Sequence, residues 1–448
     1  MSAILKQALR PATRVTTLPN GLKVVTEAMP SAPATTCISI MVKGGSRFEH
    51  KPGVSHFLEH SFFKGTEKHS ASQVTDIVEG LGAQLNAFTT REEVNFFANM
   101  RNQDWPVMLD ILTDMMLHPQ LSDHAIESER SVIMQEMDYV YTNDKNEYVM
   151  DLFFENAYEN QPVGQPILGR AEHIQKLITP DDVRMFYKRQ YTPNNMVVVG
   201  VGCDIDHEKF VKQVEESLGT LKKPRRDREI VEPDFIGQHI EQRQDHWPLV
   251  SALLGFQVCG LADMEGTSDL QVIEAMAGSY NRSQFHTAAS DFRPLVRTLH
   301  DWECAETMLP MVQQFSDFGC FGIMGQVQDT RLHDFCTASG KFLGGTVNST
   351  VHNATAFEMC KNLAATKALT TCDTATGRTD QIARQFLVHG RRISPEEQLA
   401  LIRDVTPQRV MDFAHQYFYA HEHVLACAGP CYEMPDVNIM RQHFENPL

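Results

Sequence analysis

The sequence lacks a hydrophobic run long enough to cross a membrane. A spanning helix needs roughly 18 consecutive apolar residues, and the longest apolar run here, Met196–Val201, is predicted to form a buried strand. A positive charge balance is also missing, because the formal net charge is −17 at pH 7. That balance argues against nucleic acid as a partner. It is compatible with a basic peptide substrate, and equally with solubility alone.

No C-x-x-C pair occurs among the ten cysteines. In a chain of this length, scattered cysteines indicate reduced thiols and not a disulfide framework. Cys427 and Cys431 flank a Gly-Pro turn, where we expect no metal. Acidic residues are absent from the first 26 positions, which hold four basic ones. That composition is typical of a mitochondrial targeting segment, so residues 1–14 are a candidate for a short one, whereas no secretory signal is visible.

The first part of the chain alternates predicted strands and helices. A Pro-Asn-Gly turn predicts a hairpin between strands at 14–18 and 22–26. The pattern of strands and helices is typical of helices layered on a sheet. Further strands are predicted at 36–42, 84–90 and 94–98, and helices at 54–64, 70–81, 104–117 and from 123 onward.

The helix after Pro52-Gly53 carries the sequence HFLEH, from His56 to His60. Positions four apart share a helix face, so both imidazoles point the same way and can take two corners of a tetrahedral zinc site. Glu59 stands beside them, placed to accept a proton from a water held at such a metal. This is the H-x-x-E-H order of inverted zinc peptidases. Two histidines on a solvated helix face would give the same pattern, so the hypothesis needs a third ligand and a substrate site.

The helix from residue 123 onward carries two acidic residues on one face. Glu129 and Glu136 are seven residues apart, close to two helical turns. Apolar contacts to the core are predicted for Val132, Ile133 and Met137. Two acids on an exposed helix stripe are commonplace, so this pair alone does not establish a site.

A further acidic cluster lies on the helix predicted at 145–158. Glu147, Asp151 and Glu155 are spaced four apart, beside an apolar stripe. Like charges at that spacing repel one another by a few tenths of a kcal/mol each, so helix propensity does not explain them. A cationic ligand would explain them, and so would simple solvation.

The two halves of the chain contain a repeat. Residues 178–202 match residues 405–429 at a constant offset of 227, each with a Thr-Pro helix start that leads into a buried strand ending at Gly. We therefore predict an α+β fold of two homologous helix–sheet layered domains joined by a charged, proline-containing linker. The predicted parts are a zinc-binding peptidase domain at 15–221, the linker at 222–236, and an inactive domain at 237–448 that lacks the metal motif.

Taken together, these motifs resemble the pitrilysin-type (inverzincin, M16) metallopeptidases. Within that family, the resemblance is strongest to the branch that contains the β subunits of mitochondrial processing peptidases and the Core 1 proteins of respiratory complex III. It runs from about Thr13 to Pro430 and is strongest before residue 200. The segments that carry it are TTLPNGLKVVTE, GGSRFE, GVSHFLEHSFFKGT, LGAQLNAFTTREE, SERSVIMQEM, QPVGQPILG and IARQFLVHGRRIS.

The resemblance implies roles for several residues near the motif. Glu136 would be the third zinc ligand, and Glu129 would be the acid that helps to orient the site. Phe63 would form an apolar floor for the residue after the cut. Asn86 and Ala87 would belong to an edge strand onto which an extended peptide adds.

The resemblance also implies a site for arginine. Glu147 and Asp151 would recognise an arginine just before the cut, since a guanidinium pairs well with carboxylates. The match requires one extra residue between Glu136 and Glu147. Ser61 is a second departure, because it stands where the family usually has a hydrophobic residue.

The function implied is that of a zinc metalloendopeptidase subunit that removes basic N-terminal presequences from imported mitochondrial precursors. The glycine-rich loop typical of α subunits is missing, so an α-type (Core 2-like) partner is implied. The expected location is the mitochondrial matrix, or the matrix face of the inner membrane. The alternative is a structural Core 1 subunit of complex III (ubiquinol–cytochrome c reductase), in contact with other subunits of the complex and with little or no peptidase activity. The two roles can coexist in one chain.

Overall fold

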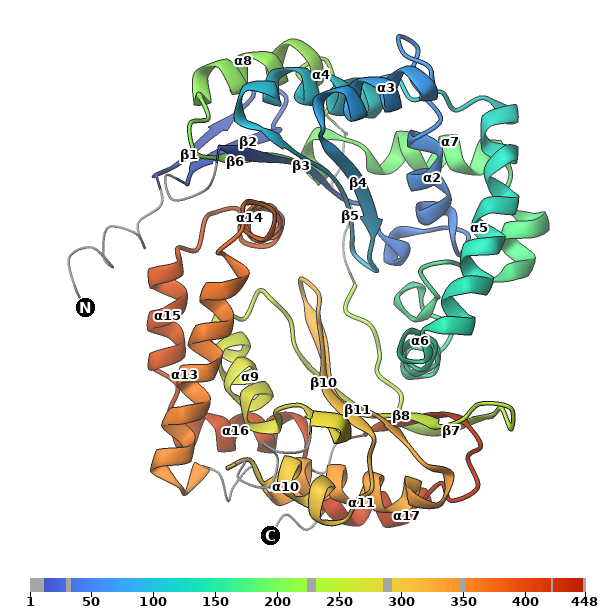
Figure 1. Cartoon of the computed structure of the whole chain (residues 1–448), viewed down its shortest axis with the longest axis vertical. Coiled ribbons are helices and arrows are strands. Elements are labelled where there is room, and N and C mark those ends of the chain that lie inside the picture. The colour runs from blue at the N-terminus through green and yellow to red at the C-terminus, as the bar shows by residue number, and fades with distance from the viewer. Residues whose placement is uncertain are drawn as a thin grey trace. The chain divides into compact units, whose positions relative to one another are not determined.

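The computed structural model describes residues 12–29, 34–223, 231–284, 292–346, 351–419 and 422–445. The chain divides into two compact units. Unit 1 comprises residues 1–139, 165–231 and 369–396, and unit 2 comprises residues 140–164, 232–368 and 397–448. Within the described ranges, each unit contains a six-stranded sheet with helices packed on it (Figure 1). The predicted α+β class with two helix–sheet units is confirmed.

Unit 1 is built on a mixed sheet with the strand order β1-β2-β6-β3-β5-β4. The predicted hairpin is confirmed, because β1 and β2 pair antiparallel around the Pro-Asn-Gly turn. β6 lies near the centre, parallel to β2 and antiparallel to β3, and all of its residues are buried. The strands are β1 (Ala12–Thr17), β2 (Lys23–Ala28), β3 (Thr35–Lys43), β4 (Gln84–Thr89), β5 (Glu93–Arg101) and β6 (Met196–Gly202).

Helices pack on both faces of this sheet. Figure 1 shows α4 (Trp105–Leu117) and α8 (His207–Leu218) on one side and α14 (Ala375–His389) on the other. α14 lies along β3 and β6. Its apolar side chains Ile382 and Phe386 are buried against Val25, Met41 and Val199 of the sheet. The other helices of this part are α2 (Val54–Phe62), α3 (Ala71–Leu81), α5 (Asp123–Asn143) and α7 (Pro180–Gln190).

Unit 2 repeats the plan with the strand order β7-β12-β8-β11-β10-β9. β12 is parallel to β7 and antiparallel to β8, as β6 is to β2 and β3. Its strands are β7 (Gln238–Arg243), β8 (Val250–Cys259), β9 (Tyr280–Asn281), β10 (Thr307–Gln314), β11 (Phe318–Val327) and β12 (Val424–Gly429). The remaining helices are α6 (Lys145–Ala157), α9 (Met264–Ala277), α10 (Pro294–Asp301), α11 (Leu332–Lys341), α13 (Ala354–Thr371), α15 (Pro395–Arg403), α16 (Pro407–Tyr417) and α17 (Val437–Glu445).

The sequence repeat corresponds to equivalent elements in the two units. α7 and α16 both begin after a capping threonine with proline at the first turn, Thr179 in one and Thr406 in the other. Each helix leads into the buried strand of its unit, β6 or β12.

Two helices are exchanged between the halves of the sequence. Each of them packs on the sheet whose strands come from the other half. α6 follows α5 in the N-terminal half but packs on β8 and β12 of unit 2. α14 lies in the C-terminal half but packs on β3 and β6 of unit 1. The compact units therefore differ from the predicted domains, which meet at a single linker at residues 222–236. Residues 140–164 belong to unit 2 and residues 369–396 belong to unit 1.

Some predictions fall outside the described residues or need correction. Residues 1–11 of the candidate targeting segment and 224–230 of the linker are not described. The prediction that Val132 contacts the core is wrong, because its side chain is 42% exposed, whereas Ile133 and Met137 are buried. Among the described residues, no helix is long and apolar enough to span a membrane.

Candidate metal centre

The helix α2, which carries the H-x-x-E-H sequence, is held firmly at its start. Gly53 precedes it with φ of +92°, a conformation that favours glycine. The Glu49 carboxylate accepts hydrogen bonds from the backbone N–H groups of Gly53 and Ser55 at 2.8 and 2.7 Å. The Ser55 hydroxyl donates to the Gly44 carbonyl at 2.5 Å. Residues 44–53, which precede the motif, thus fix the first turn of α2.

His56 and His60 lie on one face of α2, as their spacing predicts. Their ring centroids are 4.7 Å apart. The His56 side chain is buried and that of His60 is 19% exposed. α5 places Glu136 opposite them, with its Oε2 atom 2.9 Å from His60 Nε2 and 3.6 Å from His56 Nε2. The structure therefore brings together the three predicted ligands from two helices that are far apart in the sequence.

These three side chains fit a divalent cation. One possible ligand atom from each lies within 4.8 Å of the other two, and among the described residues no other group of three His, Cys, Asp or Glu side chains does so. Glu136 Oε2 is buried and accepts no hydrogen bond within the described structure, and the Nε2 atoms of both histidines face it. A His₂Glu donor set is typical of catalytic zinc sites that keep a position open for substrate or water.

Glu129 fixes the orientation of His60. An ionised carboxylate can only accept, so His60 Nδ1 donates to Glu129 Oε2 across 3.2 Å. The other nitrogen of neutral His60, Nε2, then carries a lone pair and faces the Glu136 oxygen at 2.9 Å. Two acceptors at this distance need a proton or a cation between them. Glu129 is itself buried and forms an ion pair with Lys64 through its other oxygen.

The electrostatics of the site agree with this geometry. Burial and the neighbouring His60 lower the pKa of His56 to about 4, against an opposing effect of Glu136. His56 is therefore neutral at physiological pH, which is the form that binds metals. The contact with His60 lowers the pKa of Glu136, although burial opposes it. Burial would lower the pKa of His60, but Glu136 and Glu129 reverse the effect and raise it.

Glu59 points from α2 toward the end of strand β4. The Thr89 hydroxyl donates to Glu59 Oε2 at 2.5 Å. Burial raises the pKa of Glu59, while this hydrogen bond and His60 act in the opposite direction. A carboxylate with a raised pKa is better matched to proton transfer near neutral pH. Glu59 thus has one oxygen held by Thr89, and no hydrogen bond to Oε1 occurs within the described residues.

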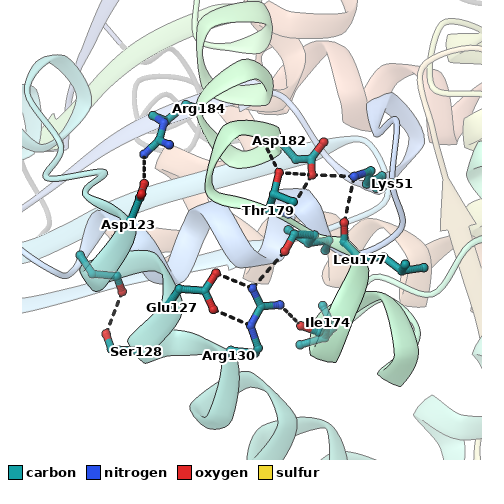
Figure 2. A network of polar contacts seen from close by, with 12 residues as sticks. Lys51, Asp123, Glu127, Ser128, Arg130, Ile174, Leu177, Thr179, Asp182 and Arg184 are labelled. Atoms are coloured by element: carbon teal, nitrogen blue, oxygen red, sulfur yellow. Dashed lines mark hydrogen bonds and ion pairs between the residues drawn. The ribbon is translucent and has the colours of Figure 1, made fainter.

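The position of α5, which carries both Glu129 and Glu136, is fixed by a network of polar contacts. Figure 2 shows Arg130 reaching from α5 to the carbonyl groups of Ile174 and of residue 178, with Glu127 paired to its guanidinium. Nearby, Lys51 forms an ion pair with Asp182 at 2.6 Å. Lys51 lies just before α2, so the same segment, residues 174–184, anchors both helices of the candidate metal centre.

The predicted peptide-binding residues lie on an exposed edge. β4 is an edge strand of the unit 1 sheet. The backbone N–H of Ala87 is bonded at 2.8 Å by the side chain of Asn86 and not by another strand. Phe63 follows the last residue of α2 as its C-cap and is 37% exposed. Since Thr89 ends β4, this edge leads directly to Glu59.

The two residues predicted to recognise arginine lie on α6 and so belong to unit 2. The Asp151 side chain is buried, and the Tyr141 hydroxyl donates to its Oδ2 atom at 2.8 Å. Glu147 lies one turn earlier and is half-buried. These two carboxylates belong to unit 2, whereas the three predicted metal ligands belong to unit 1.

Thr89, Lys64 and Tyr141 were not anticipated from the sequence. Lys64 lies four residues after His60, a spacing that offers a signal, since it extends the same helix face. Thr89 and Tyr141 offer none, because each contact joins elements whose pairing only the fold determines. Ser61, the departure within the motif, is fully buried and donates to the Phe57 carbonyl at 2.8 Å, so its hydroxyl is satisfied within α2.

Comparison with known proteins relates this site to a peptidase family. The family model "Insulinase (Peptidase family M16)" matches residues 23–171, and "Peptidase M16 inactive domain" matches residues 177–344. The β subunit of the mitochondrial-processing peptidase of Blastocladiella emersonii is 33% identical over 96% of this chain and 91% of its own. The chain belongs to peptidase family M16. The family predicted from the motifs is thereby confirmed.

Other M16 relatives give the same result. The β subunit of the Neurospora crassa mitochondrial-processing peptidase is 32% identical over 93% of this chain and 88% of its own, and that of Bos taurus is 30% identical over 96% and 86%. A chain in the structure "Complex III2 from Candida albicans, Inz-5 bound" matches with a TM-score of 0.83 at 20% identity, over 96% of this chain and 99% of that chain. This likeness shows a shared fold.

Proposed function

We propose that this chain is the catalytic subunit of a zinc endopeptidase that removes basic presequences from precursor proteins imported into mitochondria. The observation that carries the proposal is the convergence of His56, His60 and Glu136 on one point, next to Glu59. The names of the M16 relatives, which are β subunits of mitochondrial-processing peptidases, support the substrate class. The word "mitochondrial" in these names supports a mitochondrial location, and "subunit beta" supports a partnership with another subunit. We propose that this partner is an α-type subunit and that the location is the matrix.

His56, His60 and Glu136 would hold the zinc ion, and Glu129 would keep His60 in the required tautomer. Bound zinc acts as a Lewis acid that polarises the scissile carbonyl and makes a nearby water more acidic. Glu59 accepts the proton of the attacking water at Oε1 while Thr89 holds Oε2. Glu59 then delivers that proton to the leaving amine. Burial of the carboxylate, which raises its pKa, assists both transfers.

The peptide would bind as an additional strand along β4. Main-chain hydrogen bonds to an edge strand provide affinity without demanding a particular sequence, which suits presequences of varied composition. Asn86 occupies the Ala87 N–H in the free chain, so an incoming peptide would replace that contact. The residue after the cut would lie against Phe63.

Selection for arginine would come from α6. Glu147 and Asp151 offer two carboxylates one turn apart, and the Tyr141 hydroxyl holds Asp151 in position. A guanidinium binds such a pair with charge-assisted hydrogen bonds. The net charge of −17 would in addition attract basic peptides.

The direct test is cleavage of a fluorogenic presequence peptide by the assembly purified with its α-type partner. Glu59→Gln is expected to lower kcat by at least about 100-fold with unchanged zinc content, since a general base contributes that much or more. His56→Ala is expected to lose the metal as well. Glu79→Gln removes the same charge from an exposed position on α3. It is the control and should keep full activity. Full activity of metal-loaded Glu59→Gln, or no effect of a zinc chelator on the parent assembly, would refute the proposal.

Arginine selectivity has its own test. Glu147→Gln combined with Asp151→Asn is expected to raise KM about tenfold or more for a peptide with arginine before the cut, and to change little for its norleucine analogue. Glu155→Gln combined with Glu159→Gln, at neighbouring positions, controls for the loss of two negative charges. Equal losses on both peptides would contradict the arginine site.

A structural role in complex III is the second candidate. A chain in the Candida albicans complex III2 structure has a similar fold, which favours this candidate. At 20% identity, that likeness shows the fold alone. Co-purification of this chain with membrane cytochromes would support that role. The peptidase assay on the same material decides whether both roles are present.

A further inference from the structure

A cavity of about 360 Å³ lies in unit 1, at one end of its three central strands. Its walls come from the start of β2, the end of β3, the start of β6 and the last turns of α14. β2 and β6 are parallel, and β3 is antiparallel to β6. The start of β2, the start of β6 and the end of β3 therefore lie at the same end of the sheet. The cavity is separate in sequence from the metal ligands on α2 and α5.

Two lysines enter this cavity from strands on either side of β6. Lys23 on β2 is opposite Val197 of β6, and Lys43 follows two residues after Met41, which is also opposite Val197. Alternate residues of a strand share a face, so both lysines lie on the face where Val25 and Met41 pack against α14. With β6 between them, their strands are about 10 Å apart, and flexible lysine side chains span that distance easily.

The two ammonium groups have no full counter-charge. No carboxylate lines the cavity, and within the described residues neither lysine forms an ion pair or a side-chain hydrogen bond. Glu93 is opposite Lys43 on β5 and attracts it, but the Glu93 carboxylate also forms an ion pair with Arg384 at 3.4 Å. Lys23 lies close to Gly390 at the C-terminal end of α14, where the helix dipole provides only a partial negative charge.

Both lysines are half-buried, so part of their hydration is lost without replacement. Leaving a charge partly desolvated and unpaired costs free energy, which a bound anion would recover. The rest of the wall is mixed, because Phe48, Phe386 and Leu387 are apolar whereas Gln190, Asn194 and Asn195 are polar. A cavity that combines apolar side chains with a few charged and hydrogen-bonding groups is typical of a small-molecule site.

We propose that this cavity binds a compact organic dianion, such as a dicarboxylate or a phosphate monoester. Lys23 and Lys43 would bind the two negative charges, and the apolar wall would contact the short carbon skeleton between or beside them. The chain as a whole carries a net charge of −17 and repels free anions, so any such binding must come from the local lysines. This proposal does not depend on peptidase activity.

Titration calorimetry of the full chain at fixed ionic strength tests the site, with succinate and glycerol 3-phosphate as dianions and acetate and glycerol as controls. Saturable binding of at least one dianion, and weaker binding of both controls, is expected. The dianion that binds more tightly distinguishes a carboxylate site from a phosphate site. Lys23→Met and Lys43→Met are each expected to weaken binding about tenfold, because each removes one charge-assisted contact.

Two further variants keep the result interpretable. Lys43→Arg keeps the charge and is expected to retain most of the affinity. Lys212→Met makes the same charge change on the exposed face of α8 and is expected to bind as the parent does. Circular dichroism confirms that each variant is folded. The proposal is overturned if neither dianion binds at up to about 10 mM, if Lys43→Met binds normally, or if Lys212→Met loses as much affinity as the cavity variants.

Discussion

Removing the Glu27 carboxylate should release α14 from the sheet of unit 1. Glu27 lies on β2 with none of its surface exposed. Its oxygens accept from Arg392 Nε at 2.9 Å, from Arg378 Nη1 at 3.3 Å and from the Thr13 hydroxyl at 2.7 Å. Both arginines come from residues 369–396, which contain α14. Glu27 is therefore the electrostatic attachment between the N-terminal sheet and a helix from the other end of the chain.

The expected cost follows from burial. Glu27→Met leaves two guanidinium groups, 8% and 13% exposed, without their anion. Removing one partner of a buried ion pair typically costs about 3–5 kcal/mol. If that cost falls on the docking of α14, the undocked population rises about 150-fold or more, since each 1.4 kcal/mol is a factor of ten.

Cys37 on β3 offers a built-in measurement of this undocking. Its side chain is fully buried next to Thr379 and Thr376 of α14, and burial raises the pKa of its thiol to about 11. Labelling with a maleimide, followed by mass spectrometry of the peptide that contains Cys37, measures the fraction of time for which the helix is undocked. We expect Glu27→Met to accelerate labelling about 100-fold or more.

A surface ion pair in the same unit provides the control. Arg14 and Glu208 are 56% and 74% exposed, and such pairs contribute about 0–1 kcal/mol. Glu208→Met should therefore change Cys37 labelling by less than about fivefold. In a double-mutant cycle, Glu27→Met and Arg392→Met together should accelerate labelling less than the product of their separate effects, because both remove the same ion pair. If Glu27→Met labels no faster than Glu208→Met, the attachment does not depend on this ion pair and the reasoning fails.

Two further predictions concern other carboxylates of unit 1. Burial raises the pKa of Glu93 to about 7, so the folded chain keeps a proton that the unfolded chain loses above 4.5. The contribution of Glu93 to the free energy of unfolding should fall by up to roughly 3 kcal/mol as pH rises from about 4.5 to about 7. Urea titrations across this pH range should show the fall in the parent chain and not in Glu93→Gln. The same dependence on pH in both proteins would contradict the assignment. Glu129→Gln should weaken zinc affinity about 10–100-fold in competition with a chelator. Asp138→Asn, an exposed change on the same helix, should leave zinc affinity unchanged, and equal losses would argue against orientation through His60.

Local features of the site could be predicted from the sequence because they depend on short spacings. The H-x-x-E-H spacing places His56 and His60 on one helix face, and the observed helix does so. The helix predicted at 70–81 begins at Ser70, a residue type that commonly caps helices, and Ser70 forms a full capping box with Gln73. In both cases the determining contacts lie within one or two helical turns.

Long-range features could not be predicted in this way. The acidic helix α5 offers Glu127, Glu129 and Glu136, and only packing distinguishes the residue paired with Arg130 from those at the metal centre. The apolar stripe of α6 predicts burial but does not say against which sheet. The spacing of Asp151 is compatible with a cationic ligand and with simple solvation, and it predicts neither the burial of this side chain nor its hydrogen bond from Tyr141. A hydrophobic pattern specifies that a face is covered and leaves its partner open.

The exchange of α6 and α14 has a consequence for how the chain is synthesised. The apolar face formed by Val25, Met41 and Val199 receives its helix only when residues 375–389 have emerged. Until then the N-terminal sheet exposes that face, and contacts so distant along the chain form slowly. The nascent protein is thus expected to need a chaperone throughout its elongation. A truncation shortly before residue 375 would expose the peptidase unit to aggregation and proteolysis, although every candidate zinc ligand would still be present.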